Sequence, residues 1–189
     1  MRSGIVRVLV MLATIAMAGC GAESSNAADG GAPSAAYAPG QRGVLRVRQD
    51  GARGRTWVLA LDGVRVYDTA SNKLLRRIVL PNWDVAGLVC RPDMILDPSG
   101  SVVVSANVRP KLWRIDADTF RVNERDVTLQ DREQWDLGFG GLMLAADGSL
   151  FALTSTGGWL WNVDLKSGRG RLWNWGLPIL NVCELAPIE

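Results

Sequence analysis

The chain of 189 residues contains no histidine. This absence excludes Ser-His-Asp and Cys-His mechanisms, imidazole general bases and zinc sites with histidine ligands. Its three cysteines include no pair at metal-ligand spacing. The glycine-rich stretch 138–142 lacks the lysine and the following serine or threonine of a phosphate-binding loop. The sequence therefore predicts a protein that is not an enzyme, with no catalytic residue, no metal site and no cofactor.

The chain also lacks an excess of charge once its N-terminus is set aside. It has 21 Lys and Arg against 19 Asp and Glu, and residues 1–19 hold two arginines and no acid, so the remainder has 19 of each (21 − 2 = 19). No long basic run is present, and a nucleic-acid partner needs a basic stripe. No window of a dozen residues shows sustained helical periodicity. We therefore expect no nucleic-acid partner and no major helix.

The N-terminus has the pattern of an export signal. Arg2 and Arg7 supply a positive region, Val8 to Met17 are apolar, and small residues precede Cys20. This apolar stretch is too short for a transmembrane helix and is typical of a signal peptide. Its ending resembles the lipobox of bacterial lipoproteins, although Met17 stands where leucine is commonest. An uncleaved anchor, or ordinary secretion with a chance cysteine, is the alternative.

The lipobox resemblance implies that residues 1–19 are removed and that Cys20 becomes lipidated, with the lipid bilayer as its partner. Several acyl chains hold a protein durably on a membrane. Gly21 stands where lipoproteins retained in the inner membrane carry aspartate, which favours the outer membrane if the host is Gram-negative. Residues 20–41 are rich in Gly, Ala, Ser and Pro, a composition that predicts a disordered tether.

Residues 42–189 form a different region, built on an internal repeat. Runs of four to seven apolar residues alternate with Gly, Pro, Asp and Asn, as in a β-rich domain. Asp68, Asp116 and Asp164 each end a similar phrase, at spacings of 48 and 48 residues. Because each aspartate precedes a turn, we expect its side chain to cap that turn by accepting backbone N–H bonds. The repeats are placed at about 44–90, 91–139 and 140–189.

Each repeat is predicted to form four antiparallel strands, which in the second copy are about 93–97, 101–106, 111–116 and 120–129. A four-stranded unit with this period is typical of a β-propeller blade. The fold class is thus all-β, a small propeller-like domain of about three blades plus a C-terminal strand in 177–185. Since propellers usually have about four to eight blades, three alternatives stay open: the unit closes alone, copies of the chain complete one another, or the chain is a truncated relative of a longer propeller.

Two segments resemble known propeller repeats. "LDPSGSVVVSANVRPKLWRIDADTFRV" is similar to YVTN-type repeats, and "WLWNVDLKSGRGRLW" to the repeats of pyrroloquinoline-quinone dehydrogenases. The resemblance implies a propeller architecture. It implies no function, because unrelated functions share such folds.

The tryptophans allow two interpretations. Trp113 and Trp161 occupy equivalent repeat positions, and Trp173 lies where the last strand of the third blade should dock, so we expect these three rings to pack between or within blades. Trp83 and Trp135 lie in connections between blades, beside the polar residues Asp84 and Asp136. These four residues are the candidate binding surface. As exposed aromatic platforms they would suit a glycan or another small ligand.

Cys90 and Cys183 remain once Cys20 is lipidated. In an exported chain they can form a disulfide, which would close a loop of 93 residues (183 − 90) and stabilise the fold by roughly 4–5 kcal/mol. Two buried free thiols are the alternative. Together these features predict a lipid-anchored scaffold of the bacterial cell envelope, whose partner is another envelope protein or a second copy of the chain.

Overall fold

The computed structural model describes residues 43–88, 90–130, 138–173, 179 and 182–185. All of these residues belong to one compact unit of the chain. The described residues form thirteen strands: β1 (Val44–Asp50), β2 (Arg55–Ala60), β3 (Gly63–Asp68), β4 (Leu74–Ile78), β5 (Met94–Leu96), β6 (Val102–Ser105), β7 (Lys111–Ile115), β8 (Val122–Asp126), β9 (Thr128–Leu129), β10 (Phe139–Leu144), β11 (Leu150–Thr154), β12 (Leu160–Asp164) and β13 (Arg169–Leu172). In these residues no helix is long and apolar enough to cross a membrane.

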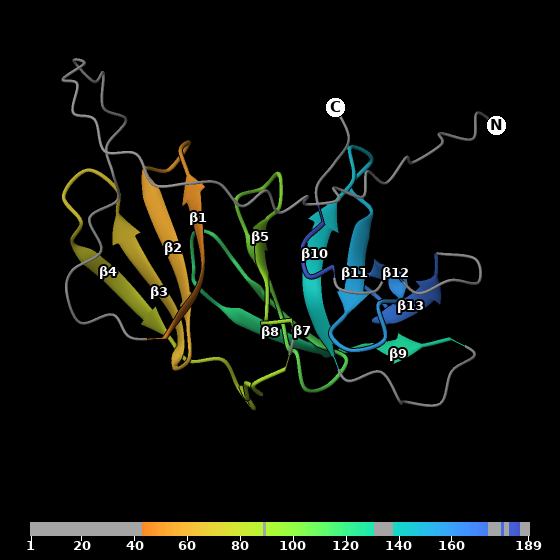
Figure 1. The fold of residues 1–189 in the computed structure, drawn as a ribbon. Helices are drawn as coiled ribbons and strands as arrows, with labels where there is room; N and C mark the ends of the chain where they lie inside the picture. Colours follow the sequence, from red (N-terminus) through yellow and green to blue (C-terminus); the bar gives the residue numbers. More distant parts are fainter. Residues whose placement is uncertain (1–42, 89, 131–137, 174–178, 180–181, 186–189) are drawn as a thin grey trace, which may run out of the picture. The chain divides into compact units, whose positions relative to one another are not determined.

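The strands form three sheets, which confirm the predicted blades (Figure 1). Blade 1 is β1–β4 and blade 2 is β5–β8, each with its strands in sequence order. Blade 3 has the order β10-β11-β12-β13-β9. The first strands of the blades (β1, β5 and β10) are neighbours, since β5 contacts both β1 and β10. Short hairpins explain the sequence order of β1–β4, β5–β8 and β10–β13, because within each of these runs every strand pairs with the next.

The segment predicted as one long fourth strand of blade 2, 120–129, is divided between two sheets. β8 ends at Asp126, and β9 pairs in parallel with β13 of blade 3. Between them the N–H of Val127 donates to the carbonyl of Pro110 at 2.7 Å, and the Val127 side chain is buried. The two residues of β9 thus follow blade 2 in the chain but pair with blade 3, and this pairing links the two sheets.

Backbone geometry repeats with the period of the sequence. Asn72, Phe120 and Gly168, which are 48 residues apart, have positive φ angles of 54°, 58° and 70°. Each lies in the turn before the last strand of a blade. This conformation suits glycine and is strained for a ring-bearing residue such as phenylalanine. Phe120 adopts this conformation with its ring packed against Trp57, the ring centroids being 5.9 Å apart.

Two apolar cores fill the spaces between blades. Trp113 and Trp161 are fully buried, as predicted, and each points toward the preceding blade. Leu112 and Trp113 lie on opposite faces of β7, because side chains alternate along a strand. Leu112 therefore belongs to the core with blade 3, and Trp113 to the core with blade 1. Blade 2 is the shared wall of both cores.

Blade 1 carries an arginine where the other two blades carry tryptophan. Arg65 stands three residues before the repeated aspartate, as do Trp113 and Trp161. Its guanidinium donates to both carboxylate oxygens of Asp62, each at 2.8 Å. Blade 1 therefore has a charged pair at the position where blades 2 and 3 bury a tryptophan ring.

The far face of blade 3 is covered by the C-terminal segment. A third core consists of Met143, Phe151, Leu153 and Leu160, with Ile179, Val182 and Leu185 packed against it. The N–H of Ile179 also donates to the carbonyl of Gly158 at 2.7 Å. The C-terminal strand was predicted within 177–185, of which residues 179 and 182–185 are described and are irregular, while the others lie outside the described residues.

Trp173 follows β13 and meets Phe151 edge to face, with ring centroids 5.0 Å apart. The backbone N–H of Trp173 donates to the carbonyl of Leu160 at 2.8 Å. The residue therefore docks on blade 3 as predicted, but 40% of its surface stays exposed. Trp173 is thus a rim contact, unlike the fully buried Trp113 and Trp161.

Candidate functional site

The connection between blades 1 and 2 is held in place by the buried side-chain amide of Asn107. Asn107, in the β6–β7 turn, is fully buried. Its side-chain nitrogen donates to the carbonyls of Ala86, at 2.9 Å, and Cys90, at 3.1 Å, while its oxygen accepts the N–H of Ala86 at 3.2 Å. A buried amide with these bonds satisfied holds a loop in one conformation. The connection is therefore presented rigidly.

Exposed apolar side chains gather on blade 1, beside this connection. Leu61, in the β2–β3 turn, is 56% exposed, and Val79, which follows β4, is 78% exposed. The indole N–H of Trp83 donates to the Leu61 carbonyl at 2.9 Å. Val79 adjoins the same turn, since its Cα lies 3.6 Å from where a Cβ on Gly63 would be. We call Leu61, Val79 and Trp83 the blade-1 patch.

The four predicted binding residues have different outcomes. Trp83 is half-buried, and its ring meets Trp113 edge to face at 5.3 Å between centroids. Because its indole N–H also donates to the Leu61 carbonyl, Trp83 serves partly as a packing residue. Asp84 is exposed beside it. Trp135 and Asp136 lie outside the described residues, so the predicted pairing of Trp83 with Trp135 stays a prediction.

A cluster of charges joins the first strands of all three blades. Asp93, just before β5, is buried, and its Oδ1 accepts from Arg46 Nε at 3.0 Å and Arg48 Nη2 at 3.2 Å. Both arginines come from β1. Oδ1 also accepts the N–H of Met94 at 2.7 Å, and Oδ2 accepts the N–H of Leu142, on β10, at 3.0 Å. Asp93 thus connects blade 2 to blades 1 and 3.

The C-terminal segment completes this cluster. Glu184 forms an ion pair with Arg46, with Nη2 and Oε1 3.0 Å apart. The neighbouring Cys183 is joined to Cys90 by a disulfide, with Cα atoms 5.1 Å apart. The predicted disulfide is therefore confirmed, and it holds the segment beside the first strands. We call Arg46, Arg48, Asp93 and Glu184 the inner-strand cluster.

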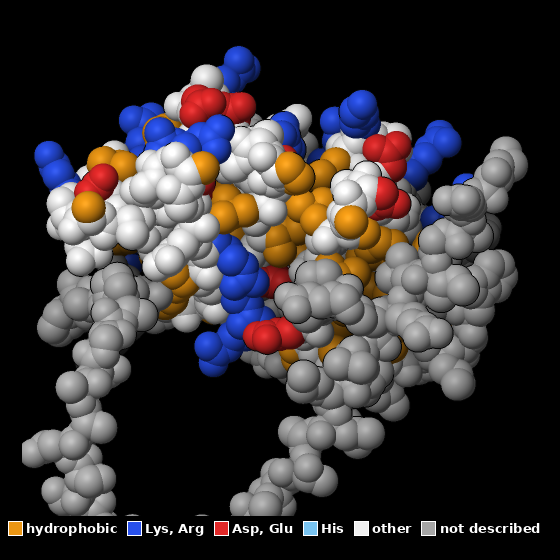
Figure 2. Space-filling view, turned by 90° about the horizontal axis from the view of Figure 1, so that it is seen from above, with side chains coloured by type: hydrophobic (Ala, Val, Ile, Leu, Met, Phe, Trp, Pro, Cys, Tyr) orange, Lys and Arg blue, Asp and Glu red, His pale blue; other side chains and the backbone are white. Residues whose placement is uncertain are grey.

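The chemistry of this cluster is that of guanidinium and carboxylate groups. Arginine stays charged at physiological pH and binds anions through a fixed fork of N–H donors. Among the residues that the structure describes, no group of three or more His, Cys, Asp or Glu side chains could hold a metal ion. Seen from above, basic and acidic side chains lie together near the middle of the face, among hydrophobic ones (Figure 2). The arrangement is suited to recognising an anion.

The sequence prediction missed the inner-strand cluster. One signal was available, because Arg46 and Arg48 are two residues apart in a strand and therefore share a face. Two charges on one face of a first strand are unusual in a sheet whose other inner positions are apolar. Asp93 gave no comparable signal, since a single acid after a proline reads as a turn residue.

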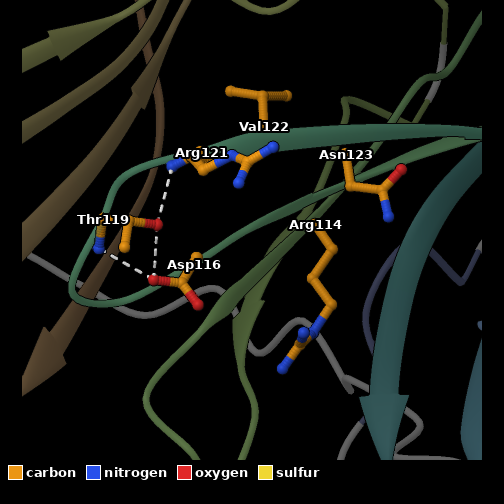
Figure 3. A pocket seen from close by; sticks show the side chains of 6 residues that line it. All are labelled: Arg114, Asp116, Thr119, Arg121, Val122 and Asn123. Atoms are coloured by element: carbon orange, nitrogen blue, oxygen red, sulfur yellow. Dashed lines mark hydrogen bonds between the residues drawn. The ribbon is translucent and has the colours of Figure 1, made fainter.

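Two shallow hollows occupy equivalent positions on blades 2 and 3. The first, of about 550 Å³, is lined by Arg114, Asp116, Thr119, Arg121, Val122 and Asn123 (Figure 3). The second, of about 520 Å³, is lined by Gln130, Asn162, Asp164, Ser167, Arg169, Gly170 and Arg171. Their lining residues repeat at the blade period of 48 residues, so the hollows are a feature of the repeated blade. Arg114 extends alongside Asp116 (Figure 3) and pairs with Asp97, with Nη2 and Oδ2 2.8 Å apart.

The repeated aspartates cap turns, as predicted. Asp116 Oδ1 accepts the N–H of Thr119 at 2.8 Å and that of Asp118 at 3.1 Å. Asp68 accepts the N–H of Ser71, and Asp164 that of Lys166, each at 2.8 Å. These bonds favour the ionised carboxyl and hold the pKa of Asp116 and Asp164 below its ordinary value; for Asp68 the Ser71 hydroxyl is the largest cause of the same lowering.

Another ion pair lies on blade 2, at the end opposite the Asp116 turn. Lys111, on β7, is buried and pairs with Glu124, and its Nζ lies 3.1 Å from Asp126. The hydrogen bond raises the pKa of Lys111 and lowers the pKa of Glu124. Asn82 donates to the same Glu124 at 3.0 Å. This pair therefore anchors the start of the 82–92 connection and is structural.

Neither a protein-family model nor a curated protein matches this sequence. Solved structures do. Virginiamycin B lyase from Staphylococcus aureus aligns with 72% of this chain, at a TM-score of 0.53 and 15% identity. A streptogramin B lyase aligns with 74% at 0.52 and 17% identity. The extracellular domain of a one-component system from B. thetaiotaomicron aligns with 71% at 0.51 and 18% identity.

These likenesses show a propeller-like fold. This chain spans 42% of the length of each lyase and 17% of that of the extracellular domain. At identities of 15–18% these likenesses describe the fold alone.

The prediction that the chain is not an enzyme is corrected by the same finding. Two of these neighbours are lyases, so enzymes occur on this fold. The error has a chemical cause. The lack of histidine excludes mechanisms that need imidazole, but Arg, Lys, Asp, Glu and Tyr side chains also act as catalytic groups in proteins.

Proposed function

We propose that this protein is a membrane-anchored lipoprotein, exposed outside the cytoplasm, whose three blades form a scaffold for contact with another protein of the cell envelope. The lipobox-like ending at Cys20 and the tether-like residues 20–41 support the anchor. The Cys90–Cys183 disulfide supports an oxidising compartment, since disulfides persist there and are rare in the cytosol.

The uneven distribution of exposed apolar side chains carries the scaffold proposal. Five large hydrophobic residues in the described part of the chain are exposed, and four of them belong to blade 1: Leu61, Leu74, Leu75 and Val79. Scattered surface hydrophobics are ordinary, whereas neighbouring ones mark an interaction surface. Leu61 and Val79 adjoin one another, while Leu74 and Leu75 begin β4 at the other end of the blade. Leu61 and Val79 sit on rigid turns next to the connection that Asn107 fixes, so ordering them costs a partner little entropy.

Site-specific photo-crosslinking in the native envelope tests this function. A photoreactive residue at position 79 should yield one discrete adduct with an envelope protein. The matched control is position 118, an exposed residue in the β7–β8 turn of blade 2, which should yield none. Leu61→Asp should reduce the adduct at position 79 strongly, because it places a charge in the contact. Equal labelling from positions 79 and 118 would refute the proposed surface.

The anchor is tested separately. Metabolic labelling with a palmitate analogue should mark the wild-type protein, and Cys20→Ala should abolish both the label and membrane association. Gly21 leads us to place the protein in the outer membrane of a Gram-negative host, which sucrose-gradient fractionation checks. An unlabelled wild-type protein that still sediments with membranes would favour an uncleaved signal anchor.

A further inference from the structure

The inner-strand cluster contains a carboxylate that a ligand could replace. Glu184 contacts Arg46 at 3.0 Å, yet its own side chain is 75% exposed. An ion pair with one so exposed partner is weak and screened by salt. Glu184 thus shows how a carboxylate lies against Arg46.

The guanidinium groups have donors to spare. Each arginine has five N–H donors. In the described part of the structure, Arg46 uses Nε for Asp93 and Nη2 for Glu184, while Arg48 uses Nη1 for the carbonyl of Val47 and Nη2 for Asp93. The Arg48 side chain is 38% exposed. Two positive groups therefore face one buried carboxylate, which leaves one positive charge for Glu184 or for a ligand.

The site is fixed before a ligand arrives. Both arginines lie on β1 and meet the same oxygen of Asp93, at 3.0 and 3.2 Å. Asp93 is itself held by the N–H groups of Met94 and Leu142. Such bonds keep the guanidinium groups from reorienting, and pre-organisation of this kind lowers the entropy cost of binding.

We propose that Arg46 and Arg48 bind a carboxylate group of a ligand, and that Glu184 competes with this ligand for the site. The chemical class follows from Glu184, because a glutamate side chain in a peptide segment is what the arginine contacts here. Two sources share this chemistry, a small carboxylic acid and an acidic side chain of a polypeptide. The site lies on the inner strands and does not depend on the blade-1 patch, so it goes beyond the proposed function.

Isothermal titration calorimetry on the full chain in detergent, at low salt, tests the proposal. The probes are glutarate and a blocked pentapeptide with glutamate at its centre. Glu184→Gln should bind either probe at least fivefold more tightly than the wild type, because the internal competitor loses its charge. Arg48→Gln should weaken binding at least tenfold. Arg121→Gln, which removes an exposed arginine of the blade-2 hollow, should leave affinity unchanged.

Further variants and probes keep the test decisive. If Arg48→Gln lowers the melting temperature, Arg48→Lys replaces it, since lysine keeps the charge but loses the fork and should bind several-fold more weakly. Tighter binding of the peptide than of glutarate assigns the ligand to a polypeptide, and equal binding assigns it to small acids; both results support a carboxylate site. Unchanged affinity in Glu184→Gln, or equal losses in the Arg48 and Arg121 variants, would overturn it.

Discussion

The disulfide between Cys90 and Cys183 makes the most quantitative prediction. It joins the start of blade 2 to the C-terminal segment that covers blade 3, and it closes a loop of 93 residues. In the chain-entropy model a loop of this length restricts the unfolded chain by an amount equivalent to about 4.6 kcal/mol at 25 °C. Domains of this kind are stable by only about 5–15 kcal/mol. Loss of the bond should therefore remove a large part of the total stability.

The measurement is urea unfolding at 25 °C of the chain from residue 21, followed by tryptophan fluorescence. Trp57, Trp113 and Trp161 are fully buried and will report the transition. For an m-value of about 2 kcal/mol/M, the double variant Cys90→Ala/Cys183→Ala should unfold at a midpoint roughly 2 M lower than the wild type. Reduced wild type should behave like the variant, which excludes an effect of the substitutions themselves.

A second consequence separates this explanation from a general loss of packing. The C-terminal segment packs on Met143, Phe151, Leu153 and Leu160. Without the disulfide this segment is tethered at one end, so a hydrophobic dye should bind before the main transition. A midpoint shift equivalent to less than about 1 kcal/mol would refute the reasoning, because it would mean that the unfolded chain gains almost no freedom.

Four further outcomes follow from the fold. Asp93→Ala should destabilise the unit by about 3–5 kcal/mol in chemical denaturation, because it leaves two arginines without their buried partner; a loss under 1 kcal/mol would contradict the role of Asp93 as a link between blades. Trp113→Ala should cost about 3–5 kcal/mol by the same assay, whereas the rim residue Trp173, replaced by alanine, should cost clearly less. Gly168→Ala should destabilise more than Gly148→Ala, because both have positive φ but only at Gly168 would a Cβ meet a carbonyl, that of Asp126 at 2.6 Å; equal melting temperatures would argue against that clash. Burial alone would raise the pKa of Asp97, but hydrogen bonds from Ser99 and Arg114 outweigh it and lower the pKa. The ionised Asp97 should therefore stabilise the fold above about pH 4, and this stabilisation should be lost as the pH falls through the lower folded-state pKa. Asp97→Asn should reduce the acid sensitivity of the urea midpoint between pH 6 and pH 3, and an unchanged profile would assign the sensitivity to other groups.

The repeat and the strands could be predicted because their signals are local. Turn glycines such as Gly100 and Gly148 and the repeated aspartates recur every 48 residues, and both sets occupy equivalent turns in the structure. The burial of Trp113 and Trp161 followed from the alternation of side chains along a strand. The pairing of Cys90 with Cys183 followed instead from the cysteine count, since these two remain once Cys20 is interpreted as lipidated in an exported chain.

The candidate site could not be predicted in the same way. Asp93 binds arginines 45 and 47 residues away, both on β1, and a backbone N–H 49 residues away, on β10. Such contacts depend on how blades pack, and a single sequence gives no measure of that. The exchange of β9 into blade 3 has the same origin, since 128–129 pairs in parallel with a strand about forty residues later. The exclusion of enzymes failed for a different reason, because it rested on familiar motifs and not on the chemistry of the residues present.

The central claim is that the three blades, with the C-terminal segment joined to blade 2 by the disulfide, form a unit that needs no second copy. Light scattering on a sizing column, without reductant, on the chain from residue 21 tests this claim most directly. We expect a monomer that melts in one cooperative transition, because Ile179, Val182 and Leu185 cover the outer apolar face of blade 3 and the Cys90–Cys183 disulfide holds this segment in place. A discrete dimer or trimer would contradict the claim, since chains would then complete one another's sheets.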